Sequence, residues 1–137
     1  MAHFVFLDTG FILALELSDD QHHVKAKKCW ASLAKHPPTL ITTSYVLDEV
    51  VTFFNTRNHH DKAVEVGQAL LSSASVKFIH VDPQTFFAGW HYFKKHSDKS
   101  YSLTDCISFI VMQDMGCKES LTFDQHFTQA GFTRRPD

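Results

Sequence analysis

This sequence of 137 residues has no long hydrophobic run and no cysteine framework. No stretch of about 18 apolar residues occurs, so no transmembrane helix is expected. The first residues also lack the charged and apolar segments of a signal peptide. The three cysteines, Cys29, Cys106 and Cys117, are odd in number and show no CxxC spacing, which favours free thiols in a reducing compartment. We therefore expect a cytoplasmic protein with no membrane association.

An excess of positive charge is missing as well. Thirteen Lys and Arg residues against fifteen Asp and Glu residues give a formal net charge of −2, which excludes nucleic-acid binding by bulk positive charge alone. Two local basic groups remain, and each is either a solvated helix face or a set of phosphate contacts that positions RNA without recognising its sequence. The two groups are Lys25, Lys27 and Lys28, and Lys94, Lys95, His96 and Lys99.

The composition is that of a globular protein. Hydrophobic residues make up 44% and charged residues 20% of the chain, which excludes disordered and low-complexity classes. At about 150 residues per domain, the length predicts a single domain over residues 1–137.

Short apolar or β-rich segments alternate with segments of helical periodicity. The expected strands are 4–7, 40–42, 76–81, 120–123 and 132–133. The expected helices are 9–17, 20–35, 44–56, 61–73, 83–95 and 103–115, the fifth of them opened by Asp82 as N-cap and Pro83 as first helical residue. This alternation predicts an α/β fold with a mainly parallel sheet of four or five strands. Ligands of such sheets bind beyond the carboxyl ends of the strands.

Acidic residues lie where this architecture puts a functional site. Asp8 and Asp124 each follow a predicted strand, although either is equally explained as a helix N-cap. Asp105 fits a capping pattern with Ser102, but the helix that it opens is apolar on almost every side. A carboxylate buried there needs a positive partner, which either a cation or the helix N-terminus supplies.

A fourth carboxylate is expected from the helix 44–56. Asp48 and Glu49 border opposite edges of its apolar arc, so helical geometry does not choose between them. Convergent carboxylates without lysine or arginine in the same motifs either have raised pKa values or bind hard divalent cations. Oxygen ligands suit Mg²⁺ or Mn²⁺, and such sites hydrolyse phosphodiesters.

Four segments resemble, in order, the motifs of PIN-domain ribonucleases: residues 4–11, 42–50, 101–106 and 121–127. The resemblance implies a PIN-like three-layer sandwich and an endoribonuclease that depends on Mg²⁺ or Mn²⁺. It selects Glu49 over Asp48 and implies four catalytic metal ligands: Asp8, Glu49, Asp105 and Asp124. It also implies that Thr9 and Thr122 support this acidic cluster by orienting a carboxylate or a water molecule.

The same resemblance implies partners. Many small, VapC-like members are the toxin half of a type II toxin–antitoxin pair, so an RNA substrate, a small antitoxin protein and a homodimer are expected. Two alternatives stay open, namely a PIN-type RNA-processing nuclease without a toxin role and a catalytically silent PIN-like interaction domain. A dehalogenase-type phosphatase is disfavoured because Gly10 stands where that family has its second Asp. A phosphoreceiver-like domain is disfavoured because the acidic pair and the late Lys are not at their expected places.

Histidines and aromatic residues offer weaker signals. The ten histidines form no zinc-ligand pattern, and surface positions are expected for most of them, although His126 follows Asp124 closely enough to approach the site. Four aromatic residues of helix 83–95 recur at helical spacing, which predicts a core or dimer face rather than base stacking. They are Phe86, Phe87, Trp90 and Phe93.

Overall fold

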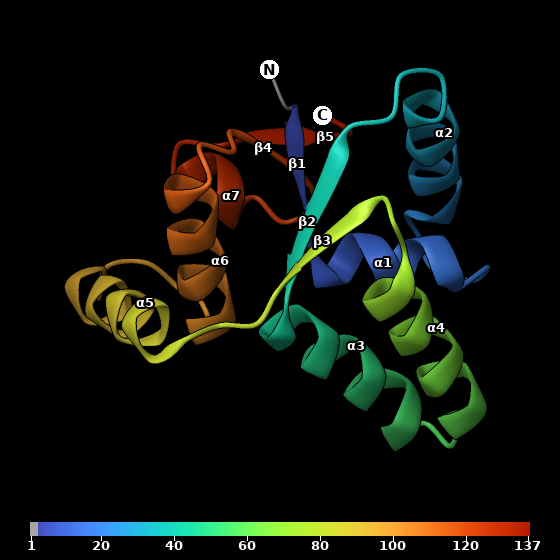
Figure 1. Cartoon of the computed structure of the whole chain (residues 1–137), viewed down its shortest axis with the longest axis horizontal. Helices are drawn as coiled ribbons and strands as arrows, with labels where there is room; N and C mark the ends of the chain where they lie inside the picture. Colours follow the sequence, from blue (N-terminus) through green and yellow to red (C-terminus); the bar gives the residue numbers. More distant parts are fainter. Residues whose placement is uncertain (1–2) are drawn as a thin grey trace.

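A five-stranded sheet forms the centre of the computed structural model, which describes residues 3–137. The strands are β1 (Phe4–Leu7), β2 (Thr39–Thr43), β3 (Val76–Ile79), β4 (Glu119–Leu121) and β5 (Thr133–Arg135). Their order is β3-β2-β1-β4-β5, and every neighbouring pair is parallel. The N-terminal strand β1 is therefore the central strand, and the predicted parallel sheet is confirmed with five strands (Figure 1).

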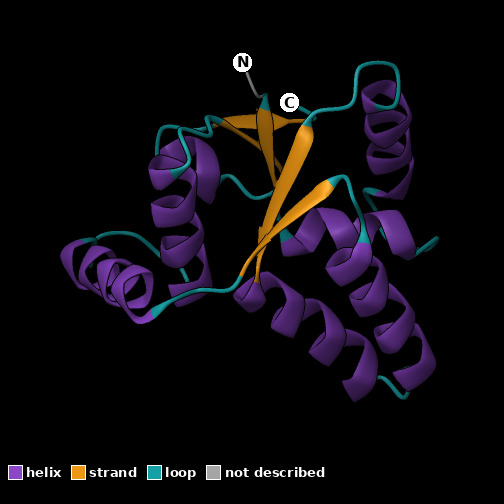
Figure 2. Cartoon of the chain, viewed as in Figure 1, coloured by secondary structure: helices purple, strands orange, loops and turns teal. Residues whose placement is uncertain are grey.

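Helices cover both faces of this sheet, as Figures 1 and 2 show. One layer contains α1 (Thr9–Glu16), α2 (His23–Leu33), α3 (Ser44–Thr56) and α4 (His60–Ser72). The other contains α5 (Pro83–Lys95), α6 (Leu103–Asp114) and the short α7 (His126–Gln129). The predicted α/β three-layer sandwich is confirmed. Within residues 3–137 no helix is long and apolar enough to cross a membrane.

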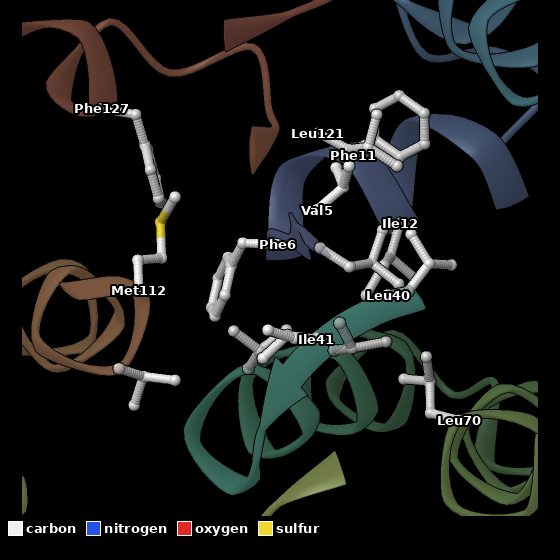
Figure 3. Packing of buried hydrophobic residues seen from close by; sticks show 14 of the residues in the cluster. Val5, Phe6, Phe11, Ile12, Leu40, Ile41, Leu70, Met112, Leu121 and Phe127 are labelled. Atoms are coloured by element: carbon white, nitrogen blue, oxygen red, sulfur yellow. The ribbon is translucent and has the colours of Figure 1, made fainter. Parts of the chain in front are cut away.

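The core lies on both faces of β1. Val5 and Phe6 are fully buried, and Phe6 packs 6.2 Å from Phe127 of α7, measured between ring centroids. Figure 3 shows Phe6 directed toward Met112 of α6, whereas Ile12 of α1 lies on the other side of the strand. A strand covered on both faces is apolar at every position, which explains the unbroken run at residues 4–7.

Helix α6 is buried nearly all round because α5 covers its outer side. Seven of its residues are buried, as the lack of a polar face predicts. Gly89 of α5 makes the close approach possible, since a Cβ atom at this position would lie 2.5 Å from Cγ1 of Ile107 and 3.1 Å from its Cα. The helix N-terminus that carries Asp105 is thereby anchored to the sheet.

Several element boundaries differ from the expectations. Helix α2 starts at His23 rather than residue 20, because residues 18–22 form turns in which the Asp20 carboxylate accepts a hydrogen bond from the backbone N–H of His22. Strand β4 ends at Leu121 rather than residue 123, and β5 spans 133–135 rather than 132–133. The four-residue helix α7 was not expected, because a single turn is too short to show a periodic pattern.

The aromatic stripe on α5 is largely outside the core. Phe87, Trp90 and Phe93 are 57%, 40% and 39% exposed, so of the two predicted roles the core role is wrong for these three side chains. Phe86 is partly buried and packs against the core. The three cysteines form no disulfide within the described residues, and two of them, Cys106 and Cys117, are buried.

Candidate active site

A polar cavity of about 480 Å³ opens at the carboxyl edge of the sheet. Its walls combine the residue that follows β1, the loop after β4, the helix α3 and the start of α6. The lining residues are Asp8, Thr9, Gly10, Glu49, Ser100, Ser102, Asp105, Phe123, Asp124 and His126. All four carboxylates expected from the sequence therefore lie around one cavity, although they are separated by more than a hundred residues of chain.

Asp8 is the most buried carboxylate of the cavity, with 7% of its surface exposed. It occupies the N-cap position of α1 but makes no side-chain capping bond. Instead its Oδ2 accepts a hydrogen bond of 2.7 Å from the hydroxyl of Thr122. Burial raises the pKa of Asp8 to about 7, with smaller upward contributions from Asp105 and Asp124, and the Thr122 hydrogen bond opposes the increase. Asp8 therefore takes the predicted N-cap position, but its carboxylate does not cap the helix.

Asp105 combines capping with a place in the cavity. Its backbone N–H donates to the Ser102 hydroxyl over 3.0 Å, and its Oδ2 accepts from the Ser102 backbone N–H over 3.1 Å. This capping box fixes the carboxylate at the N-terminus of α6. Burial raises the pKa of Asp105, and the charge of Asp124 raises it further, while its hydrogen bonds lower it. Asp105 therefore caps α6 and also lines the cavity.

His126 lies between two carboxylates. Its Nδ1 is 3.1 Å from Oδ2 of Asp105 and 3.3 Å from Oδ1 of Asp124, and its Nε2 is 3.1 Å from the hydroxyl oxygen of Ser100. One candidate ligand atom from each of Asp105, Asp124 and His126 lies within 4.8 Å of the other two. Gln125 holds the N-cap position of α7, and the Asp124 carboxylate accepts a hydrogen bond from the backbone N–H of His126, the first residue of that helix.

Glu49 forms the exposed rim of the cavity. Its Oε1 accepts a hydrogen bond of 2.7 Å from the Thr9 hydroxyl, which joins α3 to the first turn of α1. The neighbouring Asp48 is not among the residues that line the cavity. The position of Glu49 depends on where β2 ends and α3 begins, which the helical periodicity alone does not fix.

Three residues of the cavity are only partly predicted from the sequence or not at all. The sequence predicts that His126 approaches the site, and it does not predict Ser100 or Phe123 there. The spacing Asp124-Gln125-His126 is a usable signal, because the backbone N–H of His126 donates to the Asp124 carboxylate over 2.9 Å and this turn brings both side chains to the same side. No local pattern marks Ser100, whose place depends on the path of the loop between α5 and α6.

The donor set suits a hard divalent cation. Four carboxylates, one imidazole and several hydroxyls line the cavity, and within residues 3–137 no lysine or arginine is among its lining residues. The upward pKa shifts of Asp8 and Asp105 show that their negative charges are poorly compensated by the protein itself. Oxygen-rich ligation favours Mg²⁺ or Mn²⁺, and one imidazole is compatible with Mn²⁺.

Comparison with known proteins agrees with this fold and cavity. The family model described as the PIN domain matches residues 5–133. The chain therefore belongs to the PIN-domain family.

Among its relatives is the 23S rRNA-specific endonuclease VapC20 of Mycobacterium tuberculosis, found in strains CDC 1551 / Oshkosh and H37Rv. The two sequences are 36% identical over 134 residues, which cover 97% of this chain and 99% of the relative. The crystal structure of M. tuberculosis VapC20, described as a sarcin–ricin loop cleaving toxin, superimposes with a TM-score of 0.86 at 35% identity. It covers 94% of this chain and 96% of the other.

Two more distant structures share the fold. A toxin–antitoxin complex from Klebsiella pneumoniae has a TM-score of 0.61 at 14% identity, covering 88% of this chain and 87% of that one. VapBC-1 from nontypeable Haemophilus influenzae has a TM-score of 0.67 at 12% identity, covering 96% of both chains. At this level of identity the likeness concerns the fold alone.

Proposed function

We propose that this protein is a divalent-metal-dependent endoribonuclease and the toxin of a toxin–antitoxin pair. The observation that carries the proposal is the acidic cavity, in which four carboxylates from distant parts of the chain converge without a lysine or arginine among its described lining residues. The 36% identity to an endonuclease over nearly the whole of both chains supports the same reaction.

Asp8, Asp105 and Asp124 would hold the cation, with Glu49 at the rim and His126 beside them. A bound Mg²⁺ or Mn²⁺ supplies Lewis-acid chemistry, lowering the pKa of a water molecule and stabilising negative charge on a phosphate. The chain itself contributes the arrangement of the ligands. Thr122 donates to Oδ2 of Asp8 and accepts from the backbone N–H of Asp124 over 3.0 Å, so one hydroxyl orients one carboxylate and the backbone of another.

Two further contacts restrain the remaining acids. The Thr9 hydroxyl directs Oε1 of Glu49, and the His126 ring holds Asp105 and Asp124 on a common side. Hydrogen-bond partners of this kind orient ligands and raise metal affinity, typically by about 10–100-fold. Thr9 and Thr122 would thus support the cluster by orienting its carboxylates.

We propose 23S ribosomal RNA, in its sarcin–ricin loop, as the substrate. The support is the relative VapC20, which is described by that specificity and which this chain matches over 97% of its length. A ribosomal substrate places the protein in the cytoplasm, consistent with its three unpaired cysteines.

Two partners belong to this proposal. A small antitoxin would block the toxin; the VapC20 structure is described as that of a toxin, and a structure of the same fold is described as a toxin–antitoxin complex. A homodimer would cover Phe87, Trp90 and Phe93, which form an exposed aromatic stripe on α5. Light scattering checks the dimer, since Trp90→Glu would shift the molar mass to that of a monomer, whereas an unchanged mass would place the interface elsewhere.

The test of the reaction is cleavage of ribosomal RNA by purified protein. With Mn²⁺ or Mg²⁺ we expect a defined cut in 23S rRNA and no cut with a chelator. Asp105→Asn lowers the rate by more than about 100-fold, because removing a ligand costs at least as much as removing a partner that orients one. Asp48→Asn is the matched control and keeps the rate. Intact RNA with the wild type, or equal cutting by Asp105→Asn, would overturn the proposal.

Expression in cells separates the toxin from the remaining alternatives. Growth arrest by the wild type and not by Asp105→Asn identifies a toxin. Cleavage without growth arrest instead identifies an RNA-processing nuclease, and RNA binding or partner binding without any cleavage identifies a silent interaction domain.

A further inference from the structure

A second hollow, of about 410 Å³, lies between α2 and the segment that follows β5. Its lining residues are Lys25, Lys28, Cys29, Arg135, Pro136 and Asp137. Three cations and Asp137 therefore surround a space large enough for a phosphate group. The hollow joins residues more than a hundred positions apart and is not part of the acidic cavity.

The strand pairing places the backbone of Arg135 at the same sheet edge as the acidic cavity, while its guanidinium reaches back along the sheet toward Glu119 at the start of β4. Arg135 is paired with Leu121 in neighbouring strands, and its carbonyl accepts a hydrogen bond of 3.0 Å from the backbone N–H of Thr122. The side chain of Thr122 is in turn bonded to Asp8. Two hydrogen bonds and one residue thus connect the Arg135 backbone with the most buried acid of the cavity.

Helix α2 provides the second connection. The His22 ring, just before α2, stacks on Phe123 of the cavity wall, with centroids 4.2 Å apart and planes inclined by 7°. Lys25 and Lys28 follow His22 at intervals of three residues, about 4.5 and 9 Å further along the helix axis. The exposed flank of α2 therefore leads from the cavity wall to the hollow.

The charge of the hollow is poorly compensated. Lys25 and Lys28 are exposed, and within residues 3–137 neither has a carboxylate at salt-bridge distance. The Arg135 guanidinium lies 3.6 Å from Glu119, so its charge is shared. Two lysines remain for an anionic ligand. The hollow is therefore locally positive, although the protein as a whole has a net charge of −2.

We propose that this hollow binds a backbone phosphate of the RNA, away from the phosphate that is cleaved. The inference rests on the proposed function and adds a subsite to it. An acidic cavity repels a polyanion, so the RNA needs cationic contacts elsewhere on the protein to be held over the carboxylates. Contacts of this kind position the strand without recognising bases.

The test measures RNA affinity in chelator, where cleavage does not interfere, over a series of salt concentrations. Lys25→Gln with Lys28→Gln leaves the Arg135–Glu119 contact in place and is the main variant. We expect at least a 10-fold weaker affinity and a salt slope smaller by about 0.7 for each phosphate that the variant no longer neutralises. Adding Arg135→Gln should extend both effects.

A triple variant with the same net charge as the variant that also carries Arg135→Gln is the control. Lys27→Gln, Lys35→Gln and Lys77→Gln change exposed lysines outside both cavities, and Lys27 lies about 160° from Lys25 around α2. This control should keep at least half of the wild-type affinity. Equal affinity and equal salt slope for the wild type and the main variant, or no RNA binding by the wild type, would overturn the inference.

Cleavage assays separate the two proposals. The main variant should raise KM at least about 5-fold for a long RNA and leave kcat within about twofold, because the hollow does not touch the reacting phosphate. RNA binding that depends on the hollow, without cleavage by the wild type, would support the hollow and contradict the nuclease. Cleavage by the wild type, together with an unchanged KM in the main variant, would support the nuclease and contradict the hollow.

Discussion

At the scale of single residues, Thr122 connects more of the site than its size suggests. It is fully buried, its hydroxyl donates to Asp8, and it accepts the backbone N–H of Asp124. Its own backbone N–H donates to Arg135. Through its side chain and its backbone, Thr122 thus links the residue that follows β1, the loop after β4 and the end of β5.

Replacing Thr122 by Val keeps the shape and removes the hydroxyl. We expect Mn²⁺ affinity, measured by calorimetry, and the rate of RNA cleavage each to fall by about 10–100-fold. Thr42→Val is the control, since Thr42 is equally buried and donates only to the carbonyl of Leu7 over 3.0 Å. It should lose stability but keep metal affinity. Equal metal affinity in the two variants would contradict this role of Thr122.

Asp8 makes the stability of the metal-free protein depend on pH. Its pKa rises from 3.8 to about 7 on folding, mainly through burial, so the folded state binds the proton more tightly than the unfolded state. The contribution of this residue is therefore fully present below about pH 4 and is lost as the pH rises through 7. Between pH 5 and 8 the loss amounts to about 3 kcal/mol.

Urea unfolding in chelator measures this effect. Asp8→Asn removes the titrating group, so its stability relative to the wild type should increase by about 3 kcal/mol between pH 5 and pH 8. Other groups titrate in both proteins and cancel in the comparison. A constant difference between the two proteins across this range would show that Asp8 stays ionised in the folded state.

The sequence indicated the four acids but not their partners. Asp8, Asp105 and Asp124 follow strands or open a buried helix, and these are positions that local patterns mark. The choice of Glu49 over Asp48 depended on the family resemblance, because helical periodicity does not show which edge of α3 faces the cavity. The hollow at Arg135 could not be predicted, since it depends on the pairing of β5 with β4, more than a hundred residues after Lys25.

At the scale of elements, the capping box of α6 serves both the helix and the cavity. Ser102→Ala removes the acceptor for the Asp105 backbone N–H and should destabilise the protein by about 1 kcal/mol. Because the Asp105 carboxylate loses a restraint on its position, cleavage should also fall by about 10-fold.

The cap of α5 offers a matched control. The Asp82 carboxylate accepts a hydrogen bond of 2.8 Å from the backbone N–H of Thr85, on a helix whose N-terminus does not line the cavity. Asp82→Ala should destabilise the protein about as much as Ser102→Ala does, as measured by the melting temperature, and should leave the cleavage rate unchanged. A similar loss of cleavage in both variants would mean that stability alone accounts for the effect of Ser102→Ala.

Element types were predictable, whereas element ends were less so. The alternation of apolar runs with helical periodicity predicted all five strands and the six longer helices. Ends set by tertiary contacts were missed, such as the end of β4 at Leu121, two residues before the expected end. The exposure of Phe87 and Trp90 could not be predicted from the sequence either, because it depends on which side of α5 is covered by α6.

At the scale of the whole molecule, the two tryptophans report on opposite layers. Trp30 lies on α2 and Trp90 on α5, on either side of the sheet (Figure 1). A single domain over residues 1–137 stays a prediction, and it requires both layers to unfold together around β1. The variants Trp30→Phe and Trp90→Phe each leave one reporter.

We expect the fluorescence transitions of these two variants in urea to superimpose on their far-UV circular dichroism, after correction for any difference in total stability. Coincident transitions indicate one cooperative unit. If the Trp90 fluorescence of Trp30→Phe changed at a lower urea concentration than the circular dichroism, and Trp90→Phe showed no such difference, α5 and α6 would form a separable unit.

The central place of β1 also has a consequence for synthesis. Strand β1 is made first, but its second edge is paired only after β4 has been made. In the same way, Asp8 is made long before Thr122, Asp124 and His126, the later residues of the cavity. At about 5–20 residues per second, roughly 6–24 s of translation separate Asp8 from His126. Throughout that interval the nascent chain carries an incomplete set of acids, so the acidic cavity cannot assemble until the last part of the chain has been made.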